Sequence, residues 1–174
     1  MKTPIVVISG YLGAGKTTLL RKILNESDKK IAVLMNEFGE IDIDGKLIKG
    51  KNVDIMELQG GCVCCSLTGE FEAAVDEIID KIKPEWIVVE TTGVAEPDAL
   101  IIDIKDNLPK LRLDCVVTVV DGDSIVKFPE IGHTAKVQIE NADLILLNKC
   151  DLINKKDIVN AERDLSEGKI VESR

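Results

Sequence analysis

The feature that most constrains this chain is the segment of residues 10–18, which reads GYLGAGKTT. It fits the pattern G-x-x-x-x-G-K-[ST], in which a glycine-rich loop surrounds phosphate groups with backbone N–H groups at the start of a helix. An apolar run over 5–9 precedes the segment, and a helical pattern over 16–27 follows it. Because the motif requires a strand before it and a helix after it, the sequence predicts a phosphate-binding loop in an α/β protein.

Two side chains of this loop have specific expected roles. Lys16 is expected to reach the β- and γ-phosphates, and the Thr17 hydroxyl is expected to bind Mg²⁺. The nucleotide-contacting residues predicted here are Gly10, Gly13, Ala14, Gly15, Lys16, Thr17 and Thr18. The alternative is a glycine-rich turn that binds no ligand. The loop by itself does not distinguish ATP from GTP, or a kinase from a hydrolase.

The rest of the chain alternates short β-rich runs with longer helical patterns. Several β-rich runs are apolar on both faces, which is typical of buried parallel strands. Further strands are expected over 31–36, 53–58, 86–90, 115–121, 144–148 and 169–171, and further helices over 68–82, 96–108 and 155–166. This order predicts an α/β fold of the P-loop NTPase class, with a mostly parallel central sheet and helices on both faces. Residues 1–174 are expected to form a single domain.

Charge and composition restrict the partners. The net charge is −9, and an acidic chain repels the phosphate backbone, so nucleic acid is not expected as a partner. Aromatic residues make up only 3% of the chain, too few for base-stacking platforms. No apolar run has the length of a membrane span, and the first one does not resemble a secretion signal. We therefore expect no membrane partner and a reducing, cytoplasmic location.

A second motif, Asn148-Lys149-Cys150-Asp151, follows the apolar run over 144–147. Guanine presents two parallel N–H donors, which the carboxylate of Asp151 in an N-K-x-D pattern accepts in bidentate fashion. Asn148 is expected to brace the loop, and the Lys149 stem to lie against the base. Adenine lacks this donor pair, so the motif favours GTP. The alternative for Asp151 is an ordinary helix cap.

Acidic residues end two other predicted strands. Glu90 is followed by Thr91-Thr92-Gly93 and is expected to hold the water shell of Mg²⁺, while the Gly93 N–H contacts the γ-phosphate. Glu37, in the glycine- and aspartate-rich stretch 36–50, is the first choice for contacting Mg²⁺ or orienting the attacking water. Three neighbours compete with it for that role: Glu40, Asp42 and Asp44. The alternative is a solvated acidic loop.

Three cysteines occur within four positions, at Cys62, Cys64 and Cys65, behind a pair of glycines. Thiolates are soft ligands that bind Zn²⁺ and related ions tightly, whereas structural zinc sites usually take four ligands. Three thiolates with an open fourth position therefore suggest a metal that is carried and released. Free core cysteines and a redox pair are the alternatives.

The remaining cysteines and the histidine carry weaker signals. Cys115 lies in an apolar run and is expected to be a small core residue. Cys150 occupies the variable position of the N-K-x-D motif and receives no role. His133 is the one histidine of the sequence; we expect it in a surface loop, with metal binding as the alternative.

The combination of GYLGAGKTT, NEFGE, GGCVCC, ETTG and NKCD resembles the CobW-like metallochaperone GTPases, which are P-loop GTPases related to the hydrogenase and urease maturation GTPases. The resemblance runs from about Ile5 to Val171. It implies binding of GTP and GDP with Mg²⁺, and GTP hydrolysis. Hydrolysis without a client is expected to be slow, because no arginine of the sequence is obviously placed as a finger. The resemblance also implies that the cysteine cluster binds Zn²⁺, Co²⁺ or a related ion for delivery to a client metalloprotein or cofactor-synthesis enzyme.

The resemblance assigns individual residues as well. By it, Lys16 and Thr17 bind phosphate and Mg²⁺, Asn148 and Asp151 read guanine, and Glu37 and Glu90 match the family's acidic positions. The second, C-terminal domain of longer relatives is expected to be absent, and Ser173 would belong to a guanine-side loop that is barely present.

Other interpretations remain open at this point. A nucleotide- or metal-dependent homodimer is compatible with the resemblance. A small-molecule kinase of the same fold would need an acceptor pocket and usually an arginine-rich lid. A nucleotide-independent metal buffer or redox sensor would use the thiols alone and would leave both nucleotide motifs unexplained.

Overall fold

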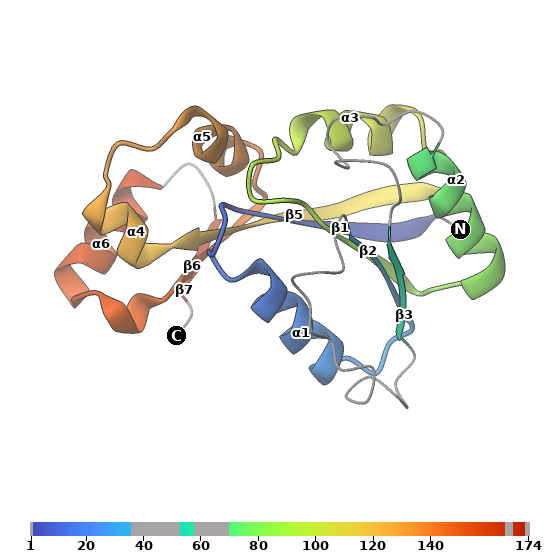
Figure 1. Ribbon diagram of the computed structural model, residues 1–174, viewed down its shortest axis with the longest axis horizontal. Coiled ribbons are helices and arrows are strands. Elements are labelled where there is room, and N and C mark those ends of the chain that lie inside the picture. The colour runs from blue at the N-terminus through green and yellow to red at the C-terminus, as the bar shows by residue number, and fades with distance from the viewer. Residues whose placement is uncertain (1, 36–52, 58–69, 166–168, 173–174) are drawn as a thin grey trace.

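The computed structural model describes residues 2–35, 53–57, 70–165 and 169–172 (Figure 1). A seven-stranded sheet runs through its centre, in the order β3-β2-β4-β1-β5-β6-β7. The strands are β1 (Thr3–Ser9), β2 (Ile31–Met35), β3 (Val53–Glu57), β4 (Trp86–Glu90), β5 (Leu111–Asp121), β6 (Leu144–Asn148) and β7 (Lys169–Glu172). All neighbouring pairs are parallel. The predicted fold class is confirmed.

Helices cover both faces of this sheet. They are α1 (Lys16–Glu26), α2 (Glu70–Glu77), α3 (Asp98–Asp106), α4 (Gly122–Lys127), α5 (His133–Glu140) and α6 (Lys155–Asp164), with a 3₁₀ turn over Cys150–Leu152. Figure 1 shows α1 on one side of the sheet and α2, α3 and α5 on the other. The helices α4 and α6 lie at the β6–β7 end.

The alternation of side chains along β2 produces two separate cores. Ala32 and Leu34 pack with α2 and α3, whereas Ile31, Val33 and Met35 pack with Leu20 and Leu24 of α1. Successive residues of a strand point to opposite faces, so a strand that is apolar throughout serves both layers. This explains why the uniformly apolar runs of the sequence become central strands.

The second predicted helix contains an irregularity. Phe71, Val75 and Ile78 are buried, as the apolar spacing of this segment indicates. The α-helix ends at Glu77, however, and continues as a π-helical turn over Ile78–Ile82. Lys83 then ends the helix in a left-handed conformation with φ 51°, a conformation uncommon for a residue other than glycine.

The structure differs from the sequence-based expectation between β5 and β6. Two helices, α4 and α5, occupy a stretch for which no helix was expected, and β5 begins at Leu111 instead of residue 115. His133 is therefore the first residue of a helix, and the expectation of a loop was wrong. Cys115 is only partly buried, because residues of β5 before Val116 alternate between inside and outside. None of the helices described is long and apolar enough to cross a membrane.

Candidate functional site

The loop between β1 and α1 has the backbone conformation that its glycines allow. Gly10 has φ 134° and Gly15 has φ 109°, both in the region that side chains rarely adopt. A Cβ atom on Gly10 would overlap the carbonyl oxygen of Val119 in β5, and one on Gly15 would overlap the side chain of Asn148. Close packing against backbone therefore requires a glycine at position 10, and the positive φ favours glycine at both positions.

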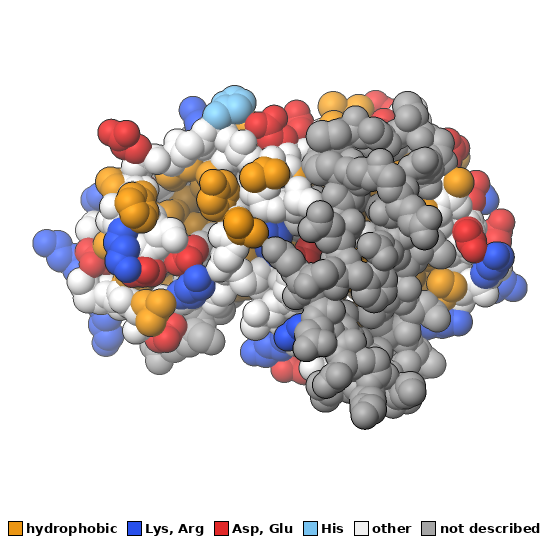
Figure 2. Space-filling model, in the orientation of Figure 1, with side chains coloured by type: hydrophobic (Ala, Val, Ile, Leu, Met, Phe, Trp, Pro, Cys, Tyr) orange, Lys and Arg blue, Asp and Glu red, His pale blue; other side chains and the backbone are white. Residues whose placement is uncertain are grey.

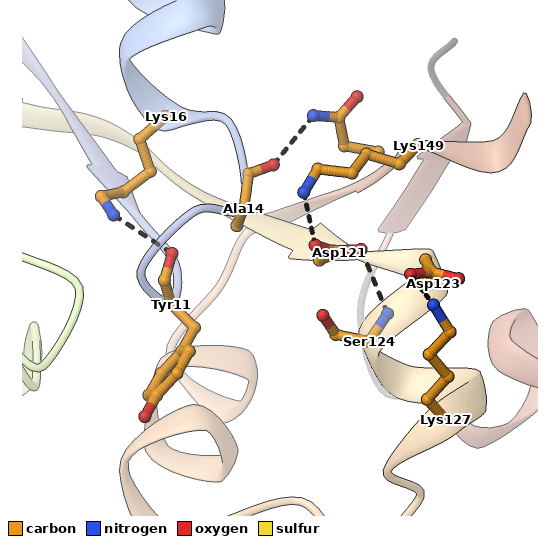
Figure 3. Close-up of polar contacts among 9 residues, drawn as sticks. Tyr11, Ala14, Lys16, Asp121, Asp123, Ser124, Lys127 and Lys149 are labelled. Atoms are coloured by element: carbon orange, nitrogen blue, oxygen red, sulfur yellow. Dashed lines mark hydrogen bonds and ion pairs between the residues drawn. The ribbon is translucent and has the colours of Figure 1, made fainter. Parts of the chain in front are cut away.

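Lys16 lies over this loop at the start of α1. Its side chain is almost fully buried, and Nζ donates a hydrogen bond of 3.3 Å to the Tyr11 carbonyl. Figure 3 shows the lysine folded back across the loop toward that carbonyl. The amine is therefore held where the loop can enclose a phosphate group.

Thr17 and Glu90 meet at the same edge of the sheet. The Thr17 hydroxyl donates to Glu90 Oε1 at 2.8 Å. Glu90 is the last residue of β4, which pairs with β1 in a register that sets it beside Ile8, so the carboxylate lies next to the phosphate loop. A hydroxyl and a carboxylate are the hard oxygen ligands that Mg²⁺ prefers, so these two residues fit the ion that the motif predicts.

The loop of residues 91–97, between β4 and α3, packs directly against the phosphate loop. A Cβ atom on Gly93 would lie 2.5 Å from the backbone nitrogen of Leu12 and 2.7 Å from its Cα. Thr91 donates its backbone N–H to the Ile8 carbonyl at 3.0 Å. Gly93 is thereby brought to the phosphate loop, and no larger residue fits there without a backbone shift. Its contact with the γ-phosphate stays a prediction.

The N-K-x-D segment contacts the phosphate loop from the other side. Asn148 Nδ2 donates to the Ala14 carbonyl at 2.8 Å, joining the end of β6 to the loop. Lys149 has a left-handed backbone with φ 60°. Asp151 is exposed. The structure therefore assembles the phosphate motif and the base-reading motif into one continuous surface.

Asp121 is a residue of this surface that the sequence analysis missed. Its Oδ2 accepts from Lys149 Nζ at 2.6 Å, and its Oδ1 accepts from the backbone N–H of Ser124 at 3.1 Å, which caps α4 (Figure 3). Partial burial raises the pKa of Asp121, but the hydrogen bonds and charge of Lys149, with the Ser124 contact, outweigh burial and lower the pKa overall. The available signal was an aspartate at the end of a buried strand and three residues before a serine.

Gln138 of α5 was missed as well. Its side chain is buried, and Nε2 donates to the carbonyls of Gly93 and Ala95. No local pattern marks this residue, because both acceptors lie on a distant segment of the chain.

An apolar groove of about 580 Å³ opens beside the phosphate loop. Its walls come from β5, α4, α5 and the segment between the two helices, together with Tyr11 and Leu12 of the loop. Figure 2 shows hydrophobic side chains gathered on this part of the surface, below the single histidine. The groove is distinct from the phosphate contacts, since neither Lys16 nor Thr17 lines it.

Several predicted site residues lie outside the described part of the chain. These are Glu37, its competitors Glu40, Asp42 and Asp44, the cluster Cys62, Cys64 and Cys65, and Ser173. Within the described ranges, no group of three histidine, cysteine or acidic side chains could hold a metal ion. His133 is exposed, with Nε2 3.7 Å from Glu96 Oε1.

The two described cysteines are in ordinary environments. Burial raises the pKa of the Cys115 thiol, and the neighbouring carboxylates of Asp143 and Asp114 raise it further, so thiolate formation is disfavoured. Cys150 is buried and its thiol donates to the Leu147 carbonyl at 3.2 Å.

A phosphate-binding loop after β1, joined through Asn148 to an N-K-x-D segment after β6, defines this chain as a P-loop nucleotide-binding domain of the GTPase fold class. Residues 4–170 match the family described as "CobW/HypB/UreG, nucleotide-binding domain". The chain belongs to this family, which confirms the resemblance seen in its motifs.

Individual relatives agree with this assignment. The zinc chaperone CobW of a Sinorhizobium species is 35% identical over 197 residues, covering 94% of this chain and 55% of that protein. The zinc chaperone YjiA of Escherichia coli K12 is 37% identical over 162 residues, covering 88% of this chain and 51% of that protein. The crystal structure of Zn(II)-bound YjiA GTPase from E. coli superposes with a TM-score of 0.73 at 27% identity, covering 100% of this chain and 57% of the other. This chain thus spans about half the length of these relatives.

Proposed function

We propose that this protein is a GTP-hydrolysing metallochaperone, in which the nucleotide state sets the affinity of a thiolate metal site. Coupling between the two sites must be reciprocal, so metal binding would also favour one nucleotide state. The observation that carries the proposal is the hydrogen bond from Asn148 to the Ala14 carbonyl, because it joins a phosphate site to a guanine-reading segment.

Guanine recognition is assigned to Asp151, with Asn148 bracing the loop and Lys149 covering the base. The exposed carboxylate of Asp151 is available for the two N–H groups of guanine. Lys149 is fixed by its ion pair with Asp121 at 2.6 Å, so its stem is held in one place at the edge of the base site.

The phosphate chemistry is assigned to the residues around Lys16. Water attacks the γ-phosphorus, the bond to the bridging oxygen breaks, and GDP and phosphate leave. Lys16 and the backbone N–H groups of residues 10–18 stabilise the charge that develops on the phosphate oxygens. When bound, Mg²⁺ would neutralise negative charge on the phosphates, and Thr17 and Glu90 are the residues that would hold it and its water shell. Glu37 is assigned to the Mg²⁺ shell or to orienting the water.

Gly93 is proposed to offer its N–H to the γ-phosphate. Its close approach to Leu12 supports this role, since the loop of residues 91–97 already contacts the loop that binds phosphate. Loss of the γ-phosphate would release Gly93 and change the position of this loop.

The cargo site is assigned to Cys62, Cys64 and Cys65. Three thiolates suit Zn²⁺, and Co²⁺ is a second candidate. The relatives named zinc chaperones favour Zn²⁺. The recipient is proposed to be a client metalloprotein or a cofactor-synthesis enzyme, with a nucleotide- or metal-dependent homodimer as a further state.

The test is the affinity for Zn²⁺ and for Co²⁺ by competition titration, with Mg²⁺ plus GDP and then with Mg²⁺ plus a non-hydrolysable GTP analogue. We expect at least tenfold tighter metal binding with the GTP analogue than with GDP, and loss of that binding in Cys64→Ala. Cys115→Ala is the matched control, because Cys115 lies in β5 away from the cluster in sequence and has a raised pKa. Equal affinities in the two states would instead mean a metal buffer or sensor that is independent of the nucleotide.

A further inference from the structure

We propose that Gln138 is a positioning residue that holds the loop of residues 91–97 in the conformation needed to sense the γ-phosphate. The inference rests on the proposed GTP hydrolysis and on the proposed role of the Gly93 N–H. Its starting observation is a carboxamide in the C-terminal half of α5, on a residue that is only 1% exposed, which faces backbone carbonyls of a distant loop.

Both donors of this carboxamide are engaged by the loop. Nε2 donates to the Ala95 carbonyl at 2.8 Å and to the Gly93 carbonyl at 3.3 Å. A primary amide has two N–H groups, so Gln138 uses its full donor capacity on two carbonyls that are two residues apart. No other side chain type of this length and neutral charge offers two such donors.

The helix that carries Gln138 is itself anchored to the sheet. The Thr118 hydroxyl, 1% exposed on β5, donates to the backbone carbonyl of Gln138 at 2.8 Å. Thr118 lies beside Ser9 of β1 in the sheet register, one residue before the phosphate loop begins. At the start of α5, the Thr134 hydroxyl contacts Glu96 Oε1 at 3.4 Å, which ties the same loop to the helix a second time.

The opposite side of the loop is pressed against the phosphate loop at Leu12. The close contact of Gly93 with the Leu12 backbone excludes any side chain at position 93. Glycine, however, restricts the backbone least of all residues. The loop closes one turn of its own, in which the Ala95 N–H donates to the Thr92 carbonyl at 3.1 Å. Further constraint on the peptide groups around Gly93 comes from outside the loop. Gln138 is the side chain that supplies it, by holding the carbonyls on both sides of Val94.

This arrangement predicts a specific functional defect. Without the two donors, the buried carbonyls of Gly93 and Ala95 lose their partners and the loop moves to regain them. GDP makes no contact that requires the Gly93 N–H, so its affinity should not change. A GTP analogue and the hydrolysis step need this group in place, so both should be impaired.

The experiment uses Gln138→Met, which keeps the length of the side chain and removes both donors. We expect its affinity for GDP to stay within about twofold of wild type. Its preference for a non-hydrolysable GTP analogue over GDP should fall roughly tenfold, and its single-turnover hydrolysis rate should fall by about the same factor. The matched control is Asn141→Leu at the C-cap of α5, which removes an amide donor to the Val137 carbonyl and has no described side-chain contact to the loop. That variant should keep the wild-type preference.

A merely structural role would reduce GDP and GTP-analogue affinity by the same factor, and this result would overturn the inference, as would an unchanged preference. If Gln138→Met does not fold, Gln138→Asn retains the amide on a shorter side chain and should show a smaller loss in the same preference. Gly93→Ala distinguishes the proposed role of Gly93 from the inference about Gln138. If it keeps the preference, the proposed role of Gly93 fails; if it loses the preference while Gln138→Met keeps it, only the inference about Gln138 fails.

Discussion

The phosphate side and the base side of the nucleotide site are built on different principles. On the phosphate side, Lys16 and Glu90 are nearly buried, and the hydrogen bond between Thr17 and Glu90 joins residues that the motifs already contain. On the base side, Asp151 is exposed and Lys149 is held by Asp121, which no nucleotide motif includes.

The two sides therefore differ in what holds their nucleotide-contacting groups in position. The phosphate loop is defined by its own backbone, since glycines at positions 10 and 15 pack against β5 and Asn148 with no space for a side chain. The base side depends on an ion pair between two partly accessible side chains. A backbone cradle is fixed by the fold, whereas a side-chain pair depends on charge state, so we expect the two sides to differ in their response to mutation and pH.

The largest effect on nucleotide binding and hydrolysis is expected from removing the Lys16 side chain on the phosphate side. Lys16→Ala should lower GTP affinity and the hydrolysis rate by on the order of a hundredfold or more, because one buried cation is lost where charge accumulates on the phosphates. The measurement is nucleotide affinity with single-turnover hydrolysis, and Lys22→Ala, an exposed lysine on the same helix, is the control. GDP affinity should fall too, since Lys16 also reaches the β-phosphate. Wild-type turnover in Lys16→Ala would rule out the assigned role.

A smaller and more specific effect is expected at Asp151. Asp151→Asn should weaken GTP binding by roughly a hundredfold, because a carboxylate that accepts two N–H groups is replaced by an amide that accepts one and repels the other. Xanthosine triphosphate carries a carbonyl in place of the guanine amino group. It should bind more tightly to the variant than to the wild-type protein. Competition between the two nucleotides measures this exchange.

Asp157→Asn provides the matched control for this exchange. Asp157 is an aspartate on α6 whose described side-chain contact is with Asn154. The control should leave the order of preference unchanged. An Asp151→Asn protein that still prefers GTP over xanthosine triphosphate by the wild-type factor would show that another group reads the base.

The sequence was sufficient to predict those parts of the fold in which the spacing of apolar residues or motif residues determines the local structure. Strands that are apolar on both faces can only be buried between two layers, so the parallel sheet and the positions of its strands along the chain followed from the pattern. Lys16, Thr17, Glu90 and Asn148 were expected at one place for a related reason, because each motif ends or follows a strand and parallel strands end at one edge. The structure brings Thr17 to Glu90 and Asn148 to the phosphate loop, and the roles of these residues stay predictions.

The sequence was insufficient where a role arises only through tertiary contact. Gln138 looks like one polar position on a short helix, and its importance depends on the loop of residues 91–97 packing above it. The helices α4 and α5 were missed because they are short and are separated by a segment with proline and glycine, which resembles a long loop. Asp121 could have been recognised as a helix cap, but its pairing with Lys149 could not.

The smallest effect is expected from a substitution at Asp121. This substitution also gives the most direct comparison between the two sides of the site. Asp121→Asn retains an oxygen that accepts the Ser124 N–H, since asparagine is as good a helix cap as aspartate. It removes only the charge that holds Lys149. We expect GTP and GDP affinity to fall severalfold together, because both nucleotides carry the same base. The melting temperature should fall by an amount corresponding to roughly 1 kcal/mol, since Lys149 is 36% exposed and water screens the pair.

The pH dependence of this effect follows from the lowered pKa of Asp121. A carboxyl whose pKa is lower in the folded protein stabilises the fold above its unfolded pKa, and this contribution is lost as the pH falls through the folded value. The difference in melting temperature between wild type and Asp121→Asn should therefore be constant near neutral pH and shrink below the ordinary aspartate range. Asp123→Asn, which removes an exposed contact to Lys127 on the same helix, should leave nucleotide affinity unchanged. If Asp121→Asn left nucleotide affinity unchanged as well, Lys149 would need no partner, and both sides of the site would be fixed by the backbone alone.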